Sequence, residues 1–188
     1  MKLSILIPSL ISRAAQLNAL RQDIDEQSVP YIGQVEVITC TDNGMRSIGD
    51  KRNELLQKAK GEYLCFIDDD DTISKDYLKL IFEKIQPDCC SLTGVITWDG
   101  VNPEVFEHSI KYEAYKTNET GTPKYERYPN HLNVIRTSIA RKFEFPKINH
   151  GEDTDFATQI FKSGLLKTEA VIPQTLYHYQ YSQMKKTV

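Results

Sequence analysis

The sequence lacks long hydrophobic runs and has no large excess of positive charge. No stretch approaches the roughly 20 apolar residues that a membrane-spanning helix needs. Residues 1–9 are too short to hold the basic region, apolar core and cleavage site of a signal peptide, so we expect a soluble, cytoplasmic protein. The formal net charge of −3 gives no broad basic surface, which argues against a nucleic-acid-binding protein.

Cysteine is also scarce. The chain has four, and each lies within or beside an apolar run that is typical of a strand: Cys40, Cys65, Cys89 and Cys90. None of them has the paired spacing of a zinc site. We therefore expect buried, reduced thiols and no structural zinc.

The length of 188 residues, 40% of them hydrophobic, is enough for one domain with a buried core. Apolar runs alternate with helical patterns in the first half of the chain. We expect strands at 2–8, 35–40, 63–67 and 89–97, and helices at 14–24, 47–59 and 74–85. Ser47 and Ser74 are predicted to cap the second and third helices. This order predicts an α/β fold with a mostly parallel, nucleotide-binding type of sheet and helices on both faces.

The alternation stops at residue 99. Residues 99–130 are polar, rich in tyrosine and interrupted by glycine and proline, so we expect hairpins or a loop there. Beyond this segment the pattern predicts a helix at 152–163 and short strands at 132–135, 170–172 and 175–179.

Four consecutive aspartates, residues 68–71, directly follow the apolar run 63–67. The carboxyl end of a buried strand is where open α/β sheets bind ligands. Adjacent carboxylates repel one another, and Mg²⁺ or Mn²⁺ would relieve the repulsion while leaving positions for substrate phosphate oxygens. The alternative is a solvated acidic turn in which Asp71 and Ser74 cap the next helix.

Two further signals are weaker. Glu152 and Asp153 begin a predicted helix, where they either complement the helix dipole or supply a base for an acceptor hydroxyl. His178 lies in an aromatic segment, where it either completes the coordination of Mn²⁺ or packs in the core. His131 and His150 are candidates for lining a cleft.

These motifs, taken in order, resemble those of the GT-A fold glycosyltransferases, in particular the inverting glycosyltransferase family 2. The resembling segments are SILIPS (4–9), TDNG (41–44), KRN (51–53), AKGEY (59–63), FIDDDD (66–71) and GED (151–153). Their order and spacing are similar to the family over roughly residues 2–98 and 132–180. The GT-A fold is therefore expected, with a smaller β and loop region on the acceptor side.

The resemblance also implies roles for individual residues. A nucleotide-sugar site would include Pro8, Ser9, Asp42, Lys51, Arg52, Asp68, Asp69 and Asp71. Lys51 and Arg52 would contact the ribose or diphosphate, unless they only form an exposed helix face. Asp70 and Asp68 would bind Mn²⁺ or Mg²⁺, with His178 as a further metal ligand. Asp153 matches the general base of the family, and the neighbouring Glu152 would orient the acceptor or the donor sugar.

The resemblance implies one domain over residues 1–188, with a nucleotide-sugar-binding half at 1–98 and an acceptor-binding, catalytic-base half at 99–188. The donor would be a nucleoside-diphosphate sugar, with UDP favoured. The acceptor would be a hydroxyl of a carbohydrate, a lipid or a protein-linked glycan, and a lipid acceptor would bring the protein to a membrane surface. We expect a single sugar to be transferred with inversion. The tyrosines of the acceptor half either pack against a sugar or belong to an ordinary loop: Tyr112, Tyr115, Tyr125 and Tyr128.

Two alternatives remain. A sugar-phosphate nucleotidyltransferase would normally have a glycine-rich, arginine-containing loop after the first strand, and residues 8–16 contain no glycine. A non-catalytic module that binds a nucleotide sugar or a metal would not need the Glu152-Asp153 pair, because a binding protein requires no base.

Overall fold

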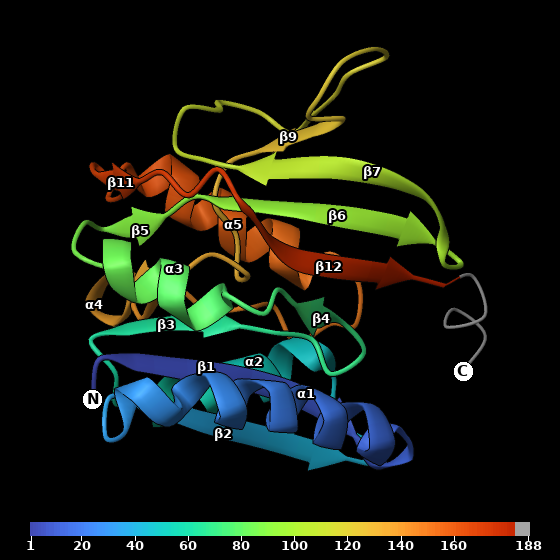
Figure 1. Ribbon diagram of the computed structural model, residues 1–188, viewed down its shortest axis with the longest axis vertical. Helices are drawn as coiled ribbons and strands as arrows, with labels where there is room; N and C mark the ends of the chain where they lie inside the picture. The colour runs from blue at the N-terminus through green and yellow to red at the C-terminus, as the bar shows by residue number, and fades with distance from the viewer. Residues whose placement is uncertain (183–188) are drawn as a thin grey trace.

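Two six-stranded sheets form the framework of the protein in a computed structural model, which describes residues 1–182 (Figure 1). The first sheet has the order β11-β5-β10-β3-β1-β2. Its strands are β1 (Leu3–Leu10), β2 (Val35–Asp42), β3 (Tyr63–Phe66), β5 (Cys89–Cys90), β10 (Ile135–Arg136) and β11 (Glu169–Ala170). Strands β2, β1 and β3 are parallel, whereas β10 is antiparallel to β3.

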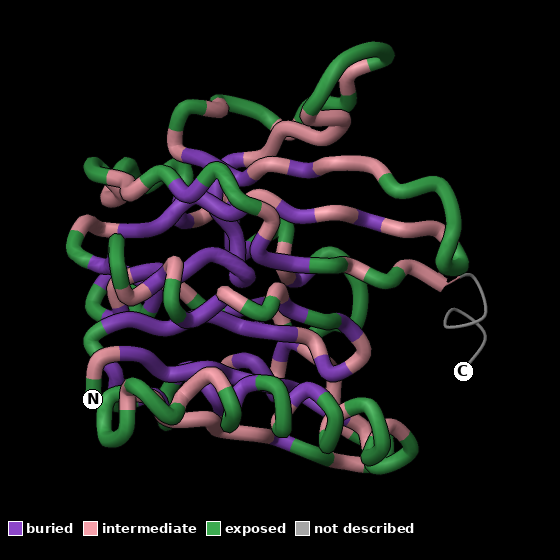
Figure 2. The backbone as a smooth tube through the Cα atoms, in the orientation of Figure 1, coloured by how far each residue is buried: buried purple, intermediate pink, exposed green. Residues whose placement is uncertain are grey.

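Helices cover both faces of the first sheet because its central strands are apolar on both faces. Along β1, Leu3, Ile5 and Ile7 pack in one core cluster, with helices α1 (Ala14–Ser28) and α3 (Tyr77–Lys84). Leu6 packs in the other cluster, with α2 (Ile48–Lys58), α4 (Thr137–Ala140) and α5 (Glu152–Ser163). Figure 2 shows the buried strands between these helices, whose outer faces are exposed. None of the helices in residues 1–182 is long and apolar enough to cross a membrane.

The second sheet has the order β4-β12-β6-β7-β9-β8, and its strands β6, β7 and β9 lie above β1, β2 and β3 in Figure 1. Its strands are β4 (Thr72–Ile73), β6 (Leu92–Trp98), β7 (Val101–His108), β8 (Lys116–Thr117), β9 (Tyr125–Arg127) and β12 (Thr175–Tyr181). Strands β6 and β7 form a hairpin whose turn is Asp99-Gly100, with φ values of 51° and 81°. An Asp-Gly pair tolerates such positive φ values, which explains why the hairpin turns at this point.

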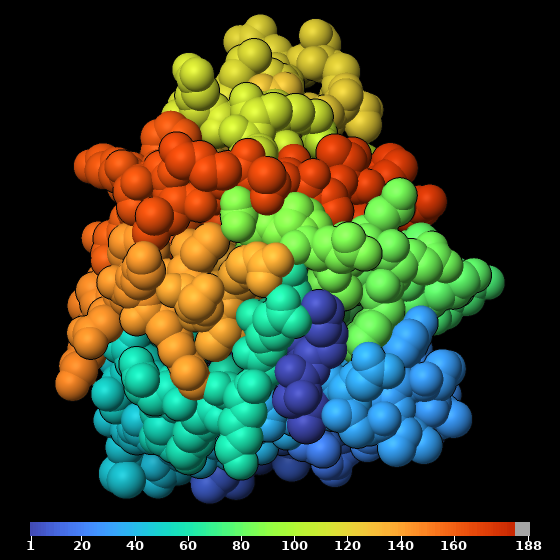
Figure 3. Space-filling view, turned by 90° about the vertical axis from the view of Figure 1, so that its left-hand side faces the viewer, coloured from blue at the N-terminus to red at the C-terminus, as the bar shows by residue number. Residues whose placement is uncertain are grey.

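The end view in Figure 3, from the side where β1 begins, shows these layers stacked in space. The first part of the chain, in blue and cyan, lies at the bottom, and the segment near residue 120, in yellow, lies at the top. The carboxyl ends of β1 and β2 therefore lie on the side of the molecule that faces away from the viewer in Figure 3. This side is on the right in Figure 1.

Most of the expected elements are confirmed. The helix predicted at 152–163 has those bounds, and Ser47 caps α2 by accepting a hydrogen bond from the Asp50 backbone N at 3.2 Å. The expected loop at 99–130 contains the hairpin and the short strands β8 and β9. The mixed α/β fold class, with helices on both faces of a sheet, is confirmed as well.

Three local predictions are wrong. The strand expected at 132–135 is only β10, which begins at Ile135, because residues 132 and 133 form a turn and a bend. The strand expected at 89–97 is divided at Ser91 between the two sheets. Ser91 turns the chain there, because its N donates to Ala170 O at 2.9 Å and its Oγ accepts from Ile172 N at 2.8 Å. Ser74 does not cap α3, which begins at Tyr77. The Gln27 side chain of α1 instead accepts from the Leu78 backbone N at 3.1 Å.

Candidate active site

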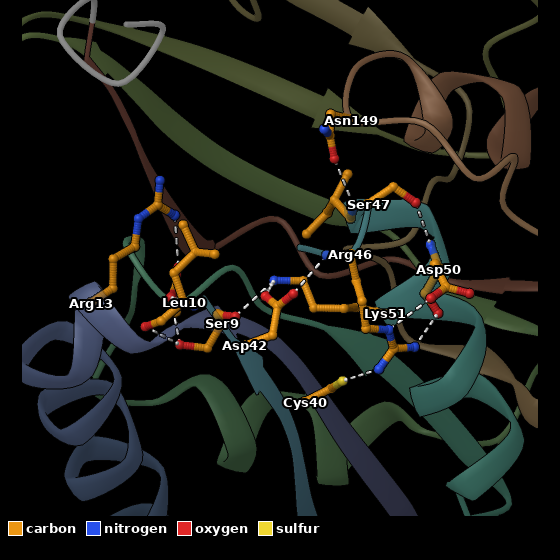
Figure 4. A network of polar contacts seen from close by, with 12 residues as sticks. Ser9, Leu10, Arg13, Cys40, Asp42, Arg46, Ser47, Asp50, Lys51 and Asn149 are labelled. Atoms are coloured by element: carbon orange, nitrogen blue, oxygen red, sulfur yellow. Dashed lines mark hydrogen bonds and ion pairs between the residues drawn. The ribbon is translucent and has the colours of Figure 1, made fainter. Parts of the chain in front are cut away.

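The first part of the site lies at the carboxyl ends of β1 and β2 (Figure 4). Lys51 reaches this edge from α2 and donates to Ser9 O and to Asp42 Oδ1, both at 2.8 Å. The side chain of Lys51 is only 3% exposed, so the alternative of an exposed helix face is wrong for this residue. The hydrogen bond from Lys51 lowers the pKa of Asp42 to about 2. Pro8 is buried in β1, where it pairs with Cys40.

Arg46, which was not among the predicted site residues, holds the loop between β2 and α2. Its backbone N donates to Asp42 Oδ2 at 2.8 Å, and its guanidinium contacts Asp50 at 2.7 Å and Glu54 at 2.5 Å (Figure 4). The spacing of four residues between Arg46 and Asp50 was the available signal. The Arg46 backbone and the Lys51 side chain thus hold the two carboxylate oxygens of Asp42.

Asp69 is buried and bound on both of its carboxylate oxygens. Its Oδ2 accepts from Ser9 Oγ at 2.7 Å and from Leu10 N at 3.2 Å, and its Oδ1 accepts from Arg13 at 2.9 Å. Arg13, which the sequence analysis missed, also lies 3.0 Å from Asp70 Oδ2. Asp69 thus joins the acidic turn to the end of β1, and its predicted contact with the nucleotide sugar stays a prediction.

Asp71 is buried as well, and its contacts are to β12. Its Oδ2 accepts from the Tyr177 hydroxyl and its Oδ1 from the Gln180 backbone N, both at 2.8 Å. Burial, with the nearby charge of Asp68, raises the pKa of Asp71 well above its usual range. These bonds attach the second sheet to the acidic turn, which is a structural role that the sequence analysis did not anticipate.

Arg52 joins the two acidic motifs. From α2 its guanidinium donates to Asp68 Oδ1 at 2.8 Å and to Glu152 Oε1 at 2.6 Å, although 100 residues separate Arg52 from Glu152. The Arg52 side chain is 4% exposed, so its role is also not that of an exposed helix face. Burial alone would raise the pKa of Asp68, but the charges of Arg52 and His131 outweigh it and leave that pKa low. The pKa of Glu152 is raised because its burial outweighs the charge of Arg52.

A cavity of about 570 Å³ lies beside this ion-pair network. Asp68 and Arg52 line one part of it, and residues 149–154 line another. Its remaining walls are largely aromatic and come from the second sheet and the segment before β10: Trp98, Phe106, His108, Tyr115, Tyr125, Arg127, His131 and Tyr179. Such a mixture of rings and a few polar groups suits a carbohydrate.

Glu152 and Asp153 both line the cavity at the start of α5. Gly151 precedes them with a φ of 83°, a left-handed conformation that favours glycine. Glu152 is paired with Arg52, whereas no cationic side chain within residues 1–182 lies within ion-pair distance of Asp153. Asp153 is half-buried, so its carboxylate is placed to meet a ligand in the cavity.

Only two of the four tyrosines of residues 99–130 line the cavity. Tyr115 and Tyr125 do so, and the Arg127 guanidinium packs over both rings at 4.8 and 5.3 Å. Tyr112 instead bonds to Glu107, and Tyr128 stacks on Phe161 at 4.5 Å between ring centroids.

The carboxylates fit a hard divalent cation with few protein ligands. Asp70 is partly exposed beyond the end of β3, and Asp68, two residues earlier, is 25% exposed. Mg²⁺ and Mn²⁺ commonly take one or two carboxylates together with substrate phosphate oxygens. Within residues 1–182 no three histidine, cysteine or acidic side chains are grouped as a metal site.

His178 is not placed with these carboxylates. It is exposed on β12, between Tyr177, which bonds to Asp71, and Tyr179, which lines the cavity. Because successive side chains of a strand point to opposite faces, His178 faces away from both the acidic turn and the cavity. The structure therefore gives no support to the expectation that His178 binds the metal.

Comparisons with known proteins give the family and the fold. A model of the family described as Glycosyl transferase family 2 matches residues 18–148, more than half of the chain. No curated protein sequence matches the chain.

Solved structures are similar at low sequence identity. TarS residues 1–349 of S. aureus is 20% identical, with a TM-score of 0.62 over 96% of this chain and 60% of that chain. The same TarS segment in complex with UDP-GlcNAc is 16% identical, with a TM-score of 0.59 over 96% and 59%. The mannosyltransferase PcManGT from Pyrobaculum calidifontis, in complex with GDP-Man and Mn²⁺, is 14% identical, with a TM-score of 0.59 over 94% and 56%. The chain thus spans less than two thirds of each, and these similarities confirm the expected GT-A type of fold.

Proposed function

The chain belongs to glycosyl transferase family 2, and on that basis we propose that it is a metal-dependent, inverting glycosyltransferase. It transfers a single sugar from a nucleoside-diphosphate sugar to an acceptor hydroxyl. One observation carries this proposal: Arg52 bonds to Asp68 and Glu152 at 2.8 and 2.6 Å, which brings the two acidic motifs together beside a cavity of about 570 Å³.

The donor nucleotide is proposed to lie at the ends of β1 and β2. Ser9, Asp42 and Lys51 form a connected, largely buried polar network there, next to the acidic turn. TarS has been solved with UDP and with UDP-GlcNAc, which supports a UDP-sugar as the donor, although PcManGT was solved with GDP-Man. The aromatic part of the cavity is proposed to bind the acceptor, a glycan or another hydroxyl compound.

The reaction is a single displacement. The Asp153 carboxylate takes the proton of the acceptor hydroxyl, whose oxygen bonds to the anomeric carbon while the bond from that carbon to the diphosphate oxygen breaks. Nucleoside diphosphate leaves, and the anomeric configuration inverts. Asp70, with Asp68 near it, would hold Mn²⁺ or Mg²⁺, and the bound ion would neutralise charge on the departing diphosphate. Arg52 keeps Glu152 and Asp68 in place, so that donor and acceptor are bound in a fixed relative orientation.

The experiment compares Asp153→Asn with Asp155→Asn, a control in the same helical turn that is exposed and does not line the cavity. Calorimetry with UDP, UDP-GlcNAc, GDP and GDP-Man, in Mn²⁺ and in chelator, measures binding. Release of nucleoside diphosphate in the presence of a panel of acceptors measures turnover.

We expect the wild type to bind a nucleotide in a metal-dependent way, and Asp153→Asn to bind it with an affinity within about twofold of the wild type. The turnover of Asp153→Asn should be lower by about 100-fold or more, which is the usual contribution of a general base. Asp155→Asn should match the wild type in both measurements. Full turnover by Asp153→Asn would remove this residue from the mechanism, and a wild type that binds no nucleotide would contradict the donor site.

A further inference from the structure

His131 is buried at the cavity with no hydrogen-bond partner. The residue is 4% exposed, lines the cavity and has both ring nitrogens unpaired. Its position is fixed by the backbone, because its carbonyl oxygen accepts from Phe66 N at 2.9 Å, which ties it to the end of β3. A buried imidazole that loses its bonds to water and gains none in return is unfavourable, so such groups usually have a partner.

The other buried histidine of the cavity behaves differently. His108 Nδ1 lies 3.2 Å from Asn133 Oδ1, which gives that ring a partner inside the protein. The unpaired buried atoms of residues 1–182 are instead concentrated at the cavity, on Arg52, Tyr115 and His131; only Ser74 Oγ lies elsewhere. This distribution indicates a polar ligand that completes the wall of the cavity.

The distance between His131 and Asp68 indicates what that ligand supplies. His131 Nε2 lies 3.9 Å from Asp68 Oδ2, too far for a direct hydrogen bond. A single oxygen atom about 2.8 Å from each of the two atoms would fit between them. A hydroxyl has the required chemistry, since it can donate to the carboxylate and accept from the Nε2–H group. The other oxygen of Asp68 is already bound to Arg52, so Oδ2 is the one that faces His131.

The order of the strands indicates which hydroxyl is bound. The first sheet runs β2-β1-β3-β10, and the proposed nucleotide site lies at β2 and β1. His131 precedes β10 and bonds to the end of β3, so it lies on the side of β3 remote from β1 and β2, and it lines the cavity that Asp153 also lines. A nucleotide sugar that extends from Asp42 past Asp68 would place its sugar, rather than its ribose, against His131.

We propose that His131 and Asp68 together bind one hydroxyl of the transferred sugar, which makes His131 a specificity-determining residue for the donor. This inference rests on the proposed function, since it requires a nucleotide-sugar donor at the acidic turn. His131 binds the sugar and leaves the nucleotide untouched. Its removal therefore weakens the binding of the nucleotide sugar without weakening that of the nucleoside diphosphate.

The test is calorimetry on the full chain with two pairs of probes in Mn²⁺: UDP with UDP-GlcNAc, and GDP with GDP-Man. His131→Phe keeps a ring and removes both nitrogens, and His131→Gln restores a polar group near Nε2. His178→Phe is the control, because His178 is exposed on β12 and does not line the cavity.

For the pair that binds, we expect His131→Phe to weaken the nucleotide sugar about tenfold, with the nucleoside diphosphate within twofold of the wild type. His131→Gln should recover most of that loss, and His178→Phe should change neither affinity. Among monodeoxy analogues of the donor sugar, the one that lacks the bound hydroxyl should bind the wild type about tenfold more weakly than the intact donor. The affinity for this analogue should not change further in His131→Phe.

A purely structural role would give a different result. In that case His131→Phe would lower the melting temperature and weaken both ligands equally, or change neither, and either outcome overturns the inference. A wild type that binds the nucleotide sugar, combined with an unchanged affinity ratio in His131→Phe, rejects the role of His131 alone. A wild type that binds none of the four probes rejects the proposed function itself.

Discussion

Replacing Arg52 with methionine tests whether the link between the two acidic motifs holds the site together. The methionine keeps an unbranched side chain beside the rings of Phe66 and Phe145, which lie 5.9 and 5.7 Å from the guanidinium. It removes the charge, and with it the bonds to Asp68 and Glu152 at 2.8 and 2.6 Å. Packing is thus largely retained while two carboxylates lose their counter-charge.

The expected loss of stability is large because the network is buried. The side chains of Arg52 and Glu152 are 4% and 6% exposed, and Asp68 is 25% exposed. Removing one partner of a buried ion pair costs about 3–5 kcal/mol, and the partial exposure of Asp68 favours the lower end, about 3 kcal/mol. For a chain of this size, that loss corresponds to a melting temperature lower by roughly 10 °C.

The loss should also depend on pH. In the wild type, burial already raises the pKa of Glu152, and Arg52 is a main reason why the pKa of Asp68 is low. Without Arg52 the pKa values of both carboxyl groups in the folded state rise above those of the unfolded state. A carboxyl group whose folded pKa is above its unfolded pKa destabilises the fold most strongly above the folded pKa. This destabilisation falls progressively as the pH drops toward the unfolded pKa. The deficit of Arg52→Met should therefore be largest near pH 8 and smaller near pH 5.

Urea unfolding, followed by the fluorescence of the single tryptophan Trp98, measures the free energy of unfolding at both pH values. Arg46→Met is the matched control, because Arg46 also contacts two carboxylates, Asp50 and Glu54, but at the surface, where ion pairs contribute little. A deficit for Arg52→Met below about 1 kcal/mol, equal to that of Arg46→Met, or independent of pH would refute the reasoning.

Three further predictions concern the rest of the chain. Gly49→Ala places a Cβ atom against Pro146 O, so we expect urea unfolding to show a free energy of unfolding lower by about 1–3 kcal/mol. An unchanged urea midpoint would mean that the segment after α4 shifts to accommodate the Cβ atom. The four buried cysteines should react with a thiol reagent only after denaturation, since burial raises the pKa of Cys65 to about 12; rapid labelling of the folded protein would contradict this packing. Lys51→Met removes the hydrogen bond that holds the pKa of Asp42 at about 2, so Asp42 should titrate closer to 3.8 in carboxyl NMR spectra. The stability that the low pKa of Asp42 provides above pH 3.8 should diminish accordingly. An unchanged titration of Asp42 would assign its low pKa to the hydrogen bond from the Arg46 backbone.

The elements that depend on local pattern could be predicted from the sequence. The continuous apolar run at 63–67 indicated a strand buried on both faces, and the prediction of α5 was correct to the residue because glycines in left-handed conformations bound it, Gly151 and Gly164. The division of the strand at Ser91 could not be predicted, because its hydrogen bonds are to residues that lie about 80 positions later.

The candidate site shows the same limit. The four aspartates look alike in the sequence, but their partners lie far along the chain: Asp69 binds Ser9, 60 residues away, and Asp71 binds Tyr177, 106 residues away. Their separate environments therefore arise only from the tertiary fold. His131 and His150 were expected to line a cleft, and both line the cavity, but the burial of His131 and its position opposite Asp68 arise only from the tertiary fold.

The attachment of β12 to the acidic turn also has a consequence for synthesis on the ribosome. Tyr177 accepts a hydrogen bond from Asp68 N at 3.1 Å across 109 residues, and the Gln180 backbone binds Asp71. At typical elongation rates, these partners emerge roughly 5–20 s after the aspartates. During that interval Asp71 has not yet met the partners that β12 supplies. Strand β12 therefore completes the surroundings of the acidic turn, and the order of translation delays the final assembly of that turn until β12 has emerged.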